Sequence, residues 1–433
     1  MISRRDIIYI SSIEWNFLWQ GHQEIALRLA ANGNRVLYVE NTGVRAPGLR
    51  DAGRIALRLK RWAGALRSQG VRQVAPNIYV CSPVVLPPFG SRWRRELNRR
   101  LFLPLVRRAA RSLGMRDVLF WTYLPTDTML DLVKLLREPR SGVVYYCVAD
   151  FTQLTPSAER LEQSERQTVA ESDVVFTNCS ELANKFAVWN ERVHVFPFGV
   201  NLDAFPLEES ATQDLARGNG HLKDSGVKTP AKAAGARALE KLPKPIIGYV
   251  GGMHRHVDFE LLAEMARARP LWSWVCVGAL QTPVGDLAAL PNVQLLGQQP
   301  HGELVDYIRQ FDVCIVPYVT SVYTTTVVPT KINEYLAMGK PVVSTNLPTV
   351  CEFNEEHDGV LLTAEARVES FLQAIEEALR LPKDAGTVAR RRRVASLGDW
   401  EARFASMCAL FEAQLEAKEA TVAPVEANAP QRV

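Results

Sequence analysis

Short apolar runs alternate with segments of helical periodicity along almost the whole chain. The first run covers residues 7–12, a helical pattern follows at 24–31, and a second run covers 35–40. Gly33 ends the helix, and two strands joined in this way form a parallel βαβ unit. Further strands are predicted at 118–121, 143–148, 174–177 and 193–196, with helical stretches between them. Residues 1–200 are therefore expected to form an open α/β domain.

A second series of the same kind occupies the C-terminal half. It starts at 245–252 and continues with strands at 274–278, 293–297, 313–317 and 341–345, with helices at 302–310 and 330–338. Residues 208–243 differ, because they are rich in Ala, Gly, Lys and Asp and contain few large apolar side chains. The pattern predicts an N-terminal Rossmann-like domain over 1–200 and a second Rossmann-like domain over 244–388. A linker with a flexible excursion over 201–243 joins them. A closing helix over 389–417 returns to the first domain, and a disordered tail over 418–433 follows it.

Composition indicates a globular protein of two or three domains, with 47% hydrophobic and 23% charged residues in 433. No window offers about eighteen consecutive apolar residues, and the N-terminus lacks the apolar core of a signal peptide. We therefore expect a cytoplasmic protein. The seven cysteines are widely scattered and mostly lie in apolar stretches, which indicates reduced core thiols rather than a disulfide framework or a zinc site.

The charge distribution is uneven. Residues 45–116 contain seventeen Lys or Arg and only two acidic residues, so the rest of the chain is net acidic. Basic and apolar side chains interleave around Arg54, Arg58 and Trp62, and again at 93–103. Amphipathic basic helices suit an anionic membrane surface, which predicts peripheral binding at the inner face of the cell membrane. The alternative is a solvated arginine-rich face over an ordinary core. Nucleic acid is not expected, because no groove-reading motif accompanies the charge.

One run of residues reduces the number of possible functions. Residues 329–345 read Pro-Thr-Lys-Ile-Asn-Glu-Tyr-Leu-Ala-Met-Gly-Lys-Pro-Val-Val-Ser-Thr. This run resembles the donor-site signature of GT-B glycosyltransferases, particularly glycosyltransferase family four (group 1) and the xanthan-type glucuronosyltransferases. Residues 195–205 and 248–253 resemble the interdomain link and the glycine loop of the same enzymes. The resemblance implies an α/β protein of GT-B fold, with two facing Rossmann-like, doubly wound domains and a cleft between them.

The residues of this run also have a physical logic of their own. A helix opened by Pro329 would present free backbone N–H groups, which attract a diphosphate. Lys331 adds a positive charge in the first turn, and Glu334 can accept two hydrogen bonds from the vicinal hydroxyls of a ribose. Gly339 ends the helix. The alternative is an ordinary amphipathic helix with a surface Lys and Glu.

The chain departs from family four at several donor positions. The first of the two glutamates that such enzymes usually carry is Thr326 here, and the usual Arg and Lys of the glycine loop are replaced by Gly252 and Val257. Neutralisation of the diphosphate then depends on Lys331, with help from Arg255 or His254. The predicted donor-binding residues are Gly251, Gly252, His254, Arg255, Thr325, Thr326, Lys331 and Glu334.

A base for the acceptor hydroxyl is expected at the end of a strand of the first domain. Asp150 ends the predicted strand 143–148, and it resembles the catalytic aspartate of the xanthan-type glucuronosyltransferase. If Asp150 is the base, the reaction inverts the anomeric centre; a retaining route would leave it an orienting role. The alternative is that Asp150 caps the next helix. The sequence has no Asp-x-Asp triplet, so we expect a metal-independent reaction without a cofactor.

A loop after the first strand supplies candidates for the acceptor site. Aromatic rings beside hydrogen-bonding side chains suit the face of a sugar. The predicted acceptor-binding residues are Trp15, Trp19, Gln20, His22 and Tyr123. The alternative for the tryptophans, His22 and Tyr123 is simple packing.

Together these features predict a hexosyltransferase-type enzyme that moves a sugar from a nucleotide diphosphate donor, UDP-linked, to a lipid-linked or cell-surface polysaccharide acceptor. Two alternatives remain open at this point. One is a nucleotide-sugar epimerase of the same fold, which would need no acceptor. The other is a non-catalytic GT-B scaffold, suggested by Thr326 and the altered glycine loop.

Overall fold

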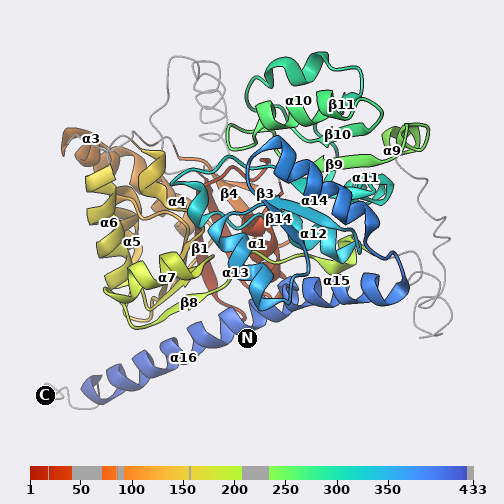
Figure 1. Cartoon of the computed structure of the whole chain (residues 1–433). Helices are drawn as coiled ribbons and strands as arrows, with labels where there is room; N and C mark the ends of the chain where they lie inside the picture. Colours follow the sequence, from red (N-terminus) through yellow and green to blue (C-terminus); the bar gives the residue numbers. More distant parts are fainter. Residues whose placement is uncertain are drawn as a thin grey trace, which may run out of the picture. The chain divides into compact units, whose positions relative to one another are not determined.

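The structure of the chain is a computed structural model that describes residues 1–17, 19–40, 71–83, 85, 92–155, 158–206 and 234–426. It divides into two compact units. Unit 1 comprises Met1–Pro197 together with the chain from Ala402 onward, and unit 2 comprises Phe198–Glu401 (Figure 1). Each unit is built on its own β-sheet.

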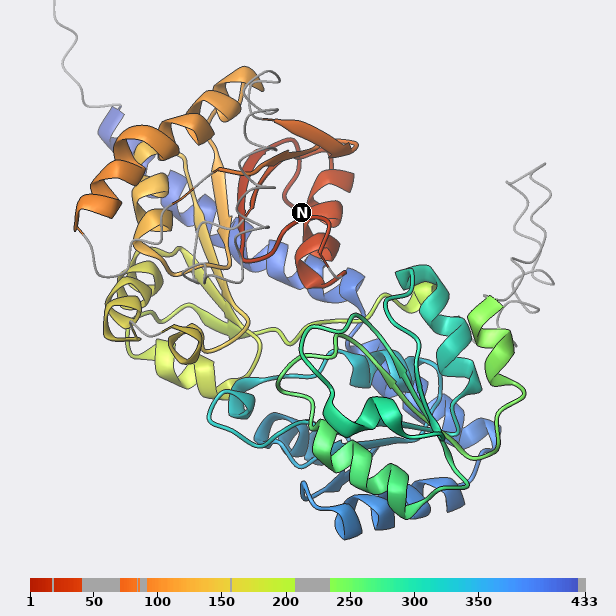
Figure 2. The ribbon, with the colours of Figure 1, turned by 90° about the horizontal axis from the view of Figure 1, so that it is seen from above.

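Unit 1 contains an eight-stranded sheet in the order β3-β4-β2-β1-β5-β6-β7-β8. Its neighbouring strands are parallel except for β3 and β4. The central strands are almost wholly buried, because helices lie on both faces of the sheet (Figure 2). The strands are β1 (Asp6–Ser11), β2 (Arg35–Glu40), β3 (Arg72–Ala75), β4 (Ile78–Cys81), β5 (Leu119–Thr122), β6 (Val143–Cys147), β7 (Val174–Thr177) and β8 (Val193–Val195).

Helix α5 of unit 1 is capped by a side chain. Thr126 accepts a hydrogen bond from the backbone N–H of Met129 at the start of this helix. The helical elements are α1 (Gly21–Ala31), α3 (Arg92–Leu97), the π-helical η2 (Asn98–Phe102), α4 (Leu103–Ser112), α5 (Asp127–Leu136), the 3-10 turn η3 (Phe151–Leu154), α6 (Ala158–Glu171), α7 (Ser180–Ala187) and most of α16 (Trp400–Glu426).

The β3–β4 hairpin was not predicted from the sequence. Its turn contains Asn77, which has a φ of 61°, a left-handed conformation that Asn tolerates better than most residues. β3 is an edge strand with two exposed and two half-buried residues, so it lacks the apolar run by which the inner strands were recognised.

Unit 2 contains a six-stranded parallel sheet in the order β11-β10-β9-β12-β13-β14. The strands are β9 (Ile246–Val250), β10 (Ser273–Val277), β11 (Val293–Leu295), β12 (Val313–Val316), β13 (Val342–Thr345) and β14 (Leu362–Ala364). This is the doubly wound order, and the direction of winding reverses between β9 and β12. Ligands of such sheets bind beyond the carboxyl ends of the strands at this reversal. The fold-class prediction of two Rossmann-like α/β units is confirmed.

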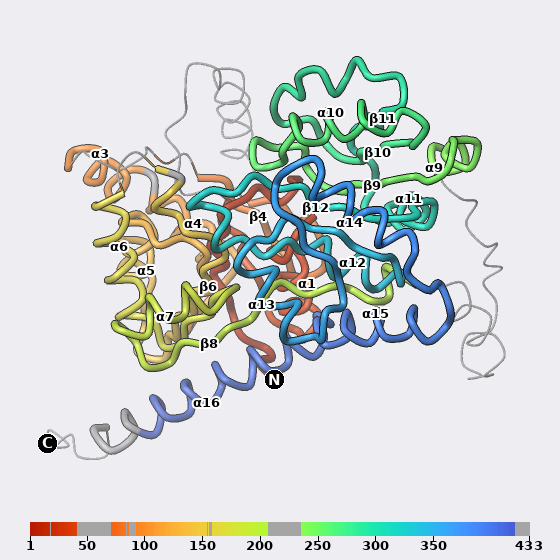
Figure 3. Tube along the Cα trace, in the orientation of Figure 1, coloured from red at the N-terminus to blue at the C-terminus, as the bar shows by residue number. Residues whose placement is uncertain are grey.

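The helices of unit 2 cover both faces of its sheet and enclose one apolar core. Figure 3 shows the path of the chain through these elements. The predicted helix 302–310 is split between η6 and α11. The elements are η4 (Leu202–Ala204), α9 (Ala234–Leu239), α10 (Phe259–Ala268), η5 (Gly285–Ala289), η6 (His301–Glu303), α11 (Leu304–Gln310), η7 (Thr324–Thr326), α12 (Lys331–Ala337), α13 (Pro348–Glu356), α14 (Val368–Arg380) and α15 (Ala385–Leu397).

The C-terminal region differs from the prediction of one closing helix over 389–417. Two helices occur there: α15 belongs to unit 2, and α16 continues into unit 1. Gly398 separates them, and its carbonyl accepts a hydrogen bond from Val200. The predicted tail from 418 is wrong for residues 418–426, which are part of α16. Residues 207–233, most of the predicted excursion, lie outside the described residues.

The cysteines are free, as predicted, and six of the seven are buried. Among the helices that the structure describes, none combines the length and the apolar character needed to cross a membrane.

Candidate active site

The loops after β9 and β10 meet beside the point where the strand order of unit 2 reverses, which lies between β9 and β12. β9 leads into Gly251 and Gly252, which are the glycines of the predicted glycine loop. Gly251 has a φ of 145° and Gly278, after β10, has a φ of 157°. A Cβ atom on Gly278 would lie 1.8 Å from the carbonyl oxygen of Gly251. Glycine at Gly278 therefore allows two backbones to approach each other directly.

The side chain of Lys331, the first residue of α12, lies over this glycine loop. A Cβ atom on Gly251 would lie 2.7 Å from Cε and 3.2 Å from Nζ of Lys331. Nζ donates a hydrogen bond to the hydroxyl of Tyr318 at 2.5 Å. It also lies 5.3 Å and 4.9 Å from the ring centroids of Tyr249 and Tyr318. The ammonium group is thus held between two aromatic rings at the carboxyl ends of β9 and β12.

Lys331 is only 8% exposed. Within the described part of the chain its ammonium group forms no ion pair with a carboxylate, and its recorded polar contact is the Tyr318 hydroxyl. Burying an ammonium group is costly unless it is paired, and the two aromatic rings offset only part of that cost. The arrangement leaves a cation that an anionic ligand at the glycine loop can neutralise.

The loop at 254–258 is fixed against the loop at 317–319. Two backbone hydrogen bonds and one antiparallel bridge join them, so the position of the first loop relative to β12 is well defined. The N–H groups of Asp258 and Val319 donate to the carbonyls of Pro317 and His256 at 2.8 and 3.0 Å, and Val257 pairs with Tyr318.

His254 lies in this loop beside Lys331. Its Nδ1 accepts a hydrogen bond from the backbone N–H of His256 at 3.3 Å. Burial, and then the charge of Lys331, lower the pKa of His254 to about 4. The imidazole is therefore neutral at pH 7, with its proton on Nε2, and can act as an uncharged donor. Arg255 is exposed, and its Nε lies 3.3 Å from the His256 ring.

Glu334 lies one turn after Lys331 on the same face of α12. Its side chain is 20% exposed, and Oε1 lies 4.0 Å from Nε2 of His301. The His301 ring packs edge-on against Phe205. Glu334 therefore lies near the surface, where its carboxylate can reach a ligand.

The threonines of η7 use their hydroxyls within the loop. Thr325 donates to the carbonyl of Val322 at 2.8 Å, and Thr326 donates to that of Tyr323 at 3.3 Å. Thr326 is only 2% exposed, whereas Thr325 is half-buried. A contact of either threonine with a sugar stays a prediction.

The start of α12 differs from the prediction. The helix begins at Lys331 and not at Pro329. The N–H groups of Ile332 and Asn333 donate to the carbonyls of Pro329 and Thr330 at 3.1 and 3.2 Å. These two first-turn donors therefore already have backbone partners, and the start of α12 offers an anion fewer free N–H groups than predicted.

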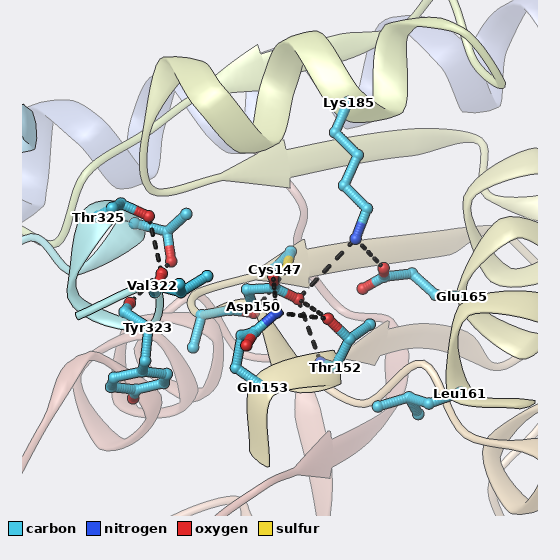
Figure 4. Close-up of polar contacts among 12 residues, drawn as sticks. Cys147, Asp150, Thr152, Gln153, Leu161, Glu165, Lys185, Val322, Tyr323 and Thr325 are labelled. Carbon is cyan, nitrogen blue, oxygen red and sulfur yellow. Dashed lines mark hydrogen bonds and ion pairs between the residues drawn. The ribbon is translucent and has the colours of Figure 1, made fainter. Parts of the chain in front are cut away.

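Asp150 follows β6 in unit 1 and caps the 3-10 turn η3 (Figure 4). Its Oδ1 accepts hydrogen bonds from the backbone N–H and the hydroxyl of Thr152, at 3.1 and 2.6 Å. Its Oδ2 lies 3.5 Å from Nε2 of Gln153. The side chain is 18% exposed. The capping alternative is thus seen in the structure, the carboxylate stays accessible, and its role as a base remains a prediction.

A buried polar cluster beside Asp150 was missed by the sequence reasoning. Glu165 on α6 is fully buried and accepts hydrogen bonds from the Tyr145 hydroxyl at 3.1 Å and from Lys185 Nζ at 2.8 Å. Lys185 Nζ also lies 3.9 Å from Oδ1 of Asp150 (Figure 4). Burial raises the pKa of Glu165, although Lys185 opposes the rise. Burial would lower the pKa of Lys185, but the charges of Glu165 and Asp150 raise it.

Three of the predicted acceptor residues lie near the start of α1. Trp19 is 40% exposed, and its indole N–H donates to the Glu24 carboxylate at 2.6 Å. Trp15 is half-buried, and its backbone N–H donates to Glu40 at 2.8 Å. Gln20 is the N-cap residue of α1. The Trp19 ring offers an accessible aromatic surface.

His22 and Tyr123 are placed differently. Both are buried, with 2% and 0% exposure, and their rings stack with centroids 3.9 Å apart. Nε2 of His22 lies 3.0 Å from the Ser12 hydroxyl, and burial lowers the pKa of His22 to about 3. The packing alternative therefore describes these two residues.

The second basic stretch forms α3 and η2. Arg95 is paired with Asp131, since two of its guanidinium nitrogens donate to the carboxylate at 2.8 and 2.9 Å. Trp93 and Leu101 are 63% and 56% exposed, and the Arg94 guanidinium lies 5.5 Å from the Trp93 ring centroid. The first basic stretch, with Arg54, Arg58, Lys60, Arg61 and Arg67, lies outside the described residues.

A comparison with protein families identifies the domain that carries Lys331. Residues 244–380 match the family described as glycosyl transferases group 1. Residues 244–380 are a group 1 glycosyltransferase domain. The matched range runs from just before β9 to the end of α14, so it contains the glycine loop, Lys331 and Glu334. The family resemblance drawn from residues 329–345 is confirmed.

One curated relative of the chain is TuaH of Bacillus subtilis (strain 168), named as a glycosyltransferase of teichuronic acid biosynthesis. The two are 30% identical over 229 residues, which is 52% of this chain and 52% of the relative. The match thus spans about half the length of the curated relative.

Solved structures resemble the chain over almost its whole length. Sucrose-phosphate synthase of Thermosynechococcus elongatus has a TM-score of 0.67 at 18% identity, over 96% of this chain and 100% of that one. HepE of Anabaena, solved in complex with UDP, has a TM-score of 0.61 at 14% identity, over 94% and 100%. These likenesses show that the group 1 domain is part of a GT-B fold, as predicted.

Proposed function

We propose that this chain is a glycosyltransferase that moves a sugar from a nucleoside diphosphate sugar to a hydroxyl group of a glycan. The observation that carries the proposal is the buried Lys331 ammonium group, which lies over the glycine loop of a group 1 domain without a carboxylate partner among the described residues. A diphosphate is a strong anion of suitable size for such a site. An epimerase is not favoured, because the matched family and the curated relative are both described as glycosyltransferases.

The donor would bind with its diphosphate at Lys331 and its ribose at Glu334. These residues are three apart on one face of α12, so both can reach one nucleotide. The neutral His254 imidazole would donate a hydrogen bond to a phosphate or sugar oxygen, and Arg255 would add charge at the surface. The structure of HepE, which was solved in complex with UDP, supports uridine as the base.

Transfer requires a proton acceptor and a stabilised leaving group. Asp150 would accept the proton of the acceptor hydroxyl, whose oxygen then bonds to the anomeric carbon. The bond between that carbon and the diphosphate oxygen breaks, and the nucleoside diphosphate leaves with the electron pair and the negative charge. Lys331 would stabilise this charge. Direct attack of this kind inverts the anomeric centre.

A thermal-shift screen against UDP, GDP, ADP and CMP tests the donor site. A ligand at about 100 times its Kd stabilises the folded state by about 2.7 kcal/mol, which is readily measured as a higher melting temperature. We expect a shift with UDP that is lost in Glu334→Ala. The absence of a shift with any nucleotide would contradict the proposal and favour a non-catalytic scaffold.

The acceptor would be lipid-linked or part of a cell-surface polysaccharide. In support, α3 and η2 present the exposed Trp93 and Leu101 among the arginines 92, 94, 99 and 100. Exposed aromatic and basic side chains of this kind favour the interface of an anionic bilayer. The curated relative TuaH is named for teichuronic acid biosynthesis, which is consistent with a polysaccharide acceptor.

Flotation with vesicles of anionic and of zwitterionic lipid tests this surface. We expect wild-type protein to float with anionic vesicles only. A Trp93→Ala/Arg94→Ser/Arg100→Ser variant should not float with either kind of vesicle. Leu271→Ala is the control, since Leu271 is 81% exposed on unit 2 and the nearby Arg267 and Arg269 are paired with carboxylates. Equal flotation of the triple variant and wild type would contradict membrane binding by α3 and η2.

A further inference from the structure

We propose that Lys185 is a positioning residue for Asp150, and that the buried carboxylate of Glu165 holds Lys185 in that role. The inference rests on the proposed function, in which Asp150 accepts the proton of the acceptor hydroxyl. Three elements of unit 1 bring the residues together: Asp150 follows β6, Glu165 lies on α6, and Lys185 lies on α7 (Figure 4).

Glu165 fixes the position of the Lys185 ammonium group. The Glu165 side chain is 1% exposed, and a buried carboxylate needs a cation and further donors to stay ionised. Lys185 Nζ lies 2.8 Å from Oε2 of Glu165, and the Tyr145 hydroxyl lies 3.1 Å from Oε1. The Lys185 side chain is 29% exposed, so without Glu165 its flexible stem would let the ammonium group move toward water.

Lys185 in turn acts on one oxygen of Asp150. Oδ1 of Asp150 faces Lys185 Nζ at 3.9 Å and also accepts two hydrogen bonds from Thr152. Among the contacts of the described residues, Oδ2 has only the exposed amide of Gln153 at 3.5 Å. The cluster therefore anchors Oδ1 and leaves Oδ2 as the oxygen that takes the proton of the acceptor hydroxyl. In this arrangement Lys185 orients the carboxylate without touching the substrate.

The central test is a double-mutant cycle on the rate of transfer. Misplacing a catalytic group slightly costs rate rather than binding, so we expect Lys185→Met to lower kcat about tenfold with the donor KM within about twofold of wild type. If Lys185 works through Asp150, Lys185→Met causes no further loss in an Asp150→Asn background. A merely structural role would cost the same factor in both backgrounds.

Stability needs a separate control, because Lys185→Met leaves Glu165 buried without its cation. The double variant Lys185→Met/Glu165→Gln removes that carboxylate charge, so its melting temperature should return toward the wild-type value while kcat stays low. Lys185→Arg, which keeps the charge, should recover most of the rate. Lys241→Met, at an exposed lysine of unit 2, is the matched control and should leave both quantities unchanged.

Two results would overturn the inference, and they are distinguishable. If wild-type protein transfers sugar and Asp150→Asn lowers the rate, but Lys185→Met costs the same in both backgrounds, the positioning role is wrong and the proposed function stands. If wild-type protein transfers no sugar from any nucleotide donor that it binds, the proposed function fails and the positioning role fails with it.

Discussion

Replacing Lys331 by methionine removes the ammonium group over the glycine loop and keeps a long, unbranched side chain. Lys331 is 8% exposed, and its ammonium group has the Tyr318 hydroxyl and two aromatic rings as its neighbours. A diphosphate bound there would be its main counter-charge. The variant therefore tests whether this buried charge is kept for a ligand.

The expected loss of affinity follows from the burial. A charge-assisted hydrogen bond is worth about 1.5–3 kcal/mol net, and about 1.4 kcal/mol corresponds to a factor of ten. The affinity for UDP should thus fall about 10- to 100-fold in Lys331→Met. The ligand-free protein should not be destabilised, because the substitution also removes the cost of burying a charge that lacks a carboxylate partner among the described residues.

Isothermal titration calorimetry with UDP measures the affinity, and urea unfolding measures the stability. Lys340→Met is the matched control. Lys340 lies just beyond the other end of α12, where its Nζ donates to the carbonyls of Arg309 and Phe311 at 2.7 and 2.9 Å, and burial lowers its pKa. That variant should lose stability and keep its UDP affinity. Unchanged UDP binding by Lys331→Met would refute the assignment of Lys331 to the diphosphate.

Three further predictions concern the same unit. Gly278→Ala should destabilise the fold by about 2–4 kcal/mol in urea unfolding, because its Cβ would lie 1.8 Å from the Gly251 carbonyl; wild-type stability would show that the loops can separate freely. His254 has a folded-state pKa of about 4, against about 6.5 when unfolded. The unfolded state therefore binds more protons between these values, and stability should fall as the pH drops from 6.5 to 4, by up to about 1.4 kcal/mol per pH unit. His254→Gln should show a shallower fall, and an identical pH dependence would be evidence against the burial of this ring. Transfer activity should persist in EDTA, whereas its loss and recovery with a divalent cation would show a metal requirement.

The sequence predicted the inner strands of both sheets except β4, because a strand that is buried on both faces is a continuous apolar run. Of the four edge strands it predicted β8 and β11 and missed β3 and β14. β3 has two exposed and two half-buried residues, so it has no such run. The end of α16 was also misjudged, since a helix rich in Ala and Glu has no apolar periodicity by which to recognise it.

Among the candidate site residues, the donor-binding residues of unit 2 could be predicted from short stretches of sequence. Lys331 and Glu334 lie within one continuous signature, and the glycine loop directly follows a strand. The cluster of Glu165 and Lys185 could not be predicted in this way, because the two residues come from different helices and their side chains meet only in the folded unit. The burial of Tyr123 was equally hidden, since an aromatic residue after a strand can face either the core or the solvent.

A run of arginines shows the same limitation. Residues 390–393 are four consecutive arginines and could pass for a basic binding surface. In the structure Arg391 donates to the carbonyl of Gly339 at 3.1 Å, and Arg392 donates to those of Ala337 and Phe205 at 2.7 and 2.9 Å. These side chains therefore donate hydrogen bonds to carbonyl groups at the C-terminal end of α12, which is the helix that carries Lys331.

The most direct test of the donor site is a crystal structure of the protein with UDP. We expect the diphosphate within hydrogen-bonding distance of Lys331 Nζ above Gly251, with the ribose hydroxyls on the carboxylate of Glu334. UDP bound at another place, without contact to Lys331 and Glu334, would contradict the assignment of the donor site to these residues.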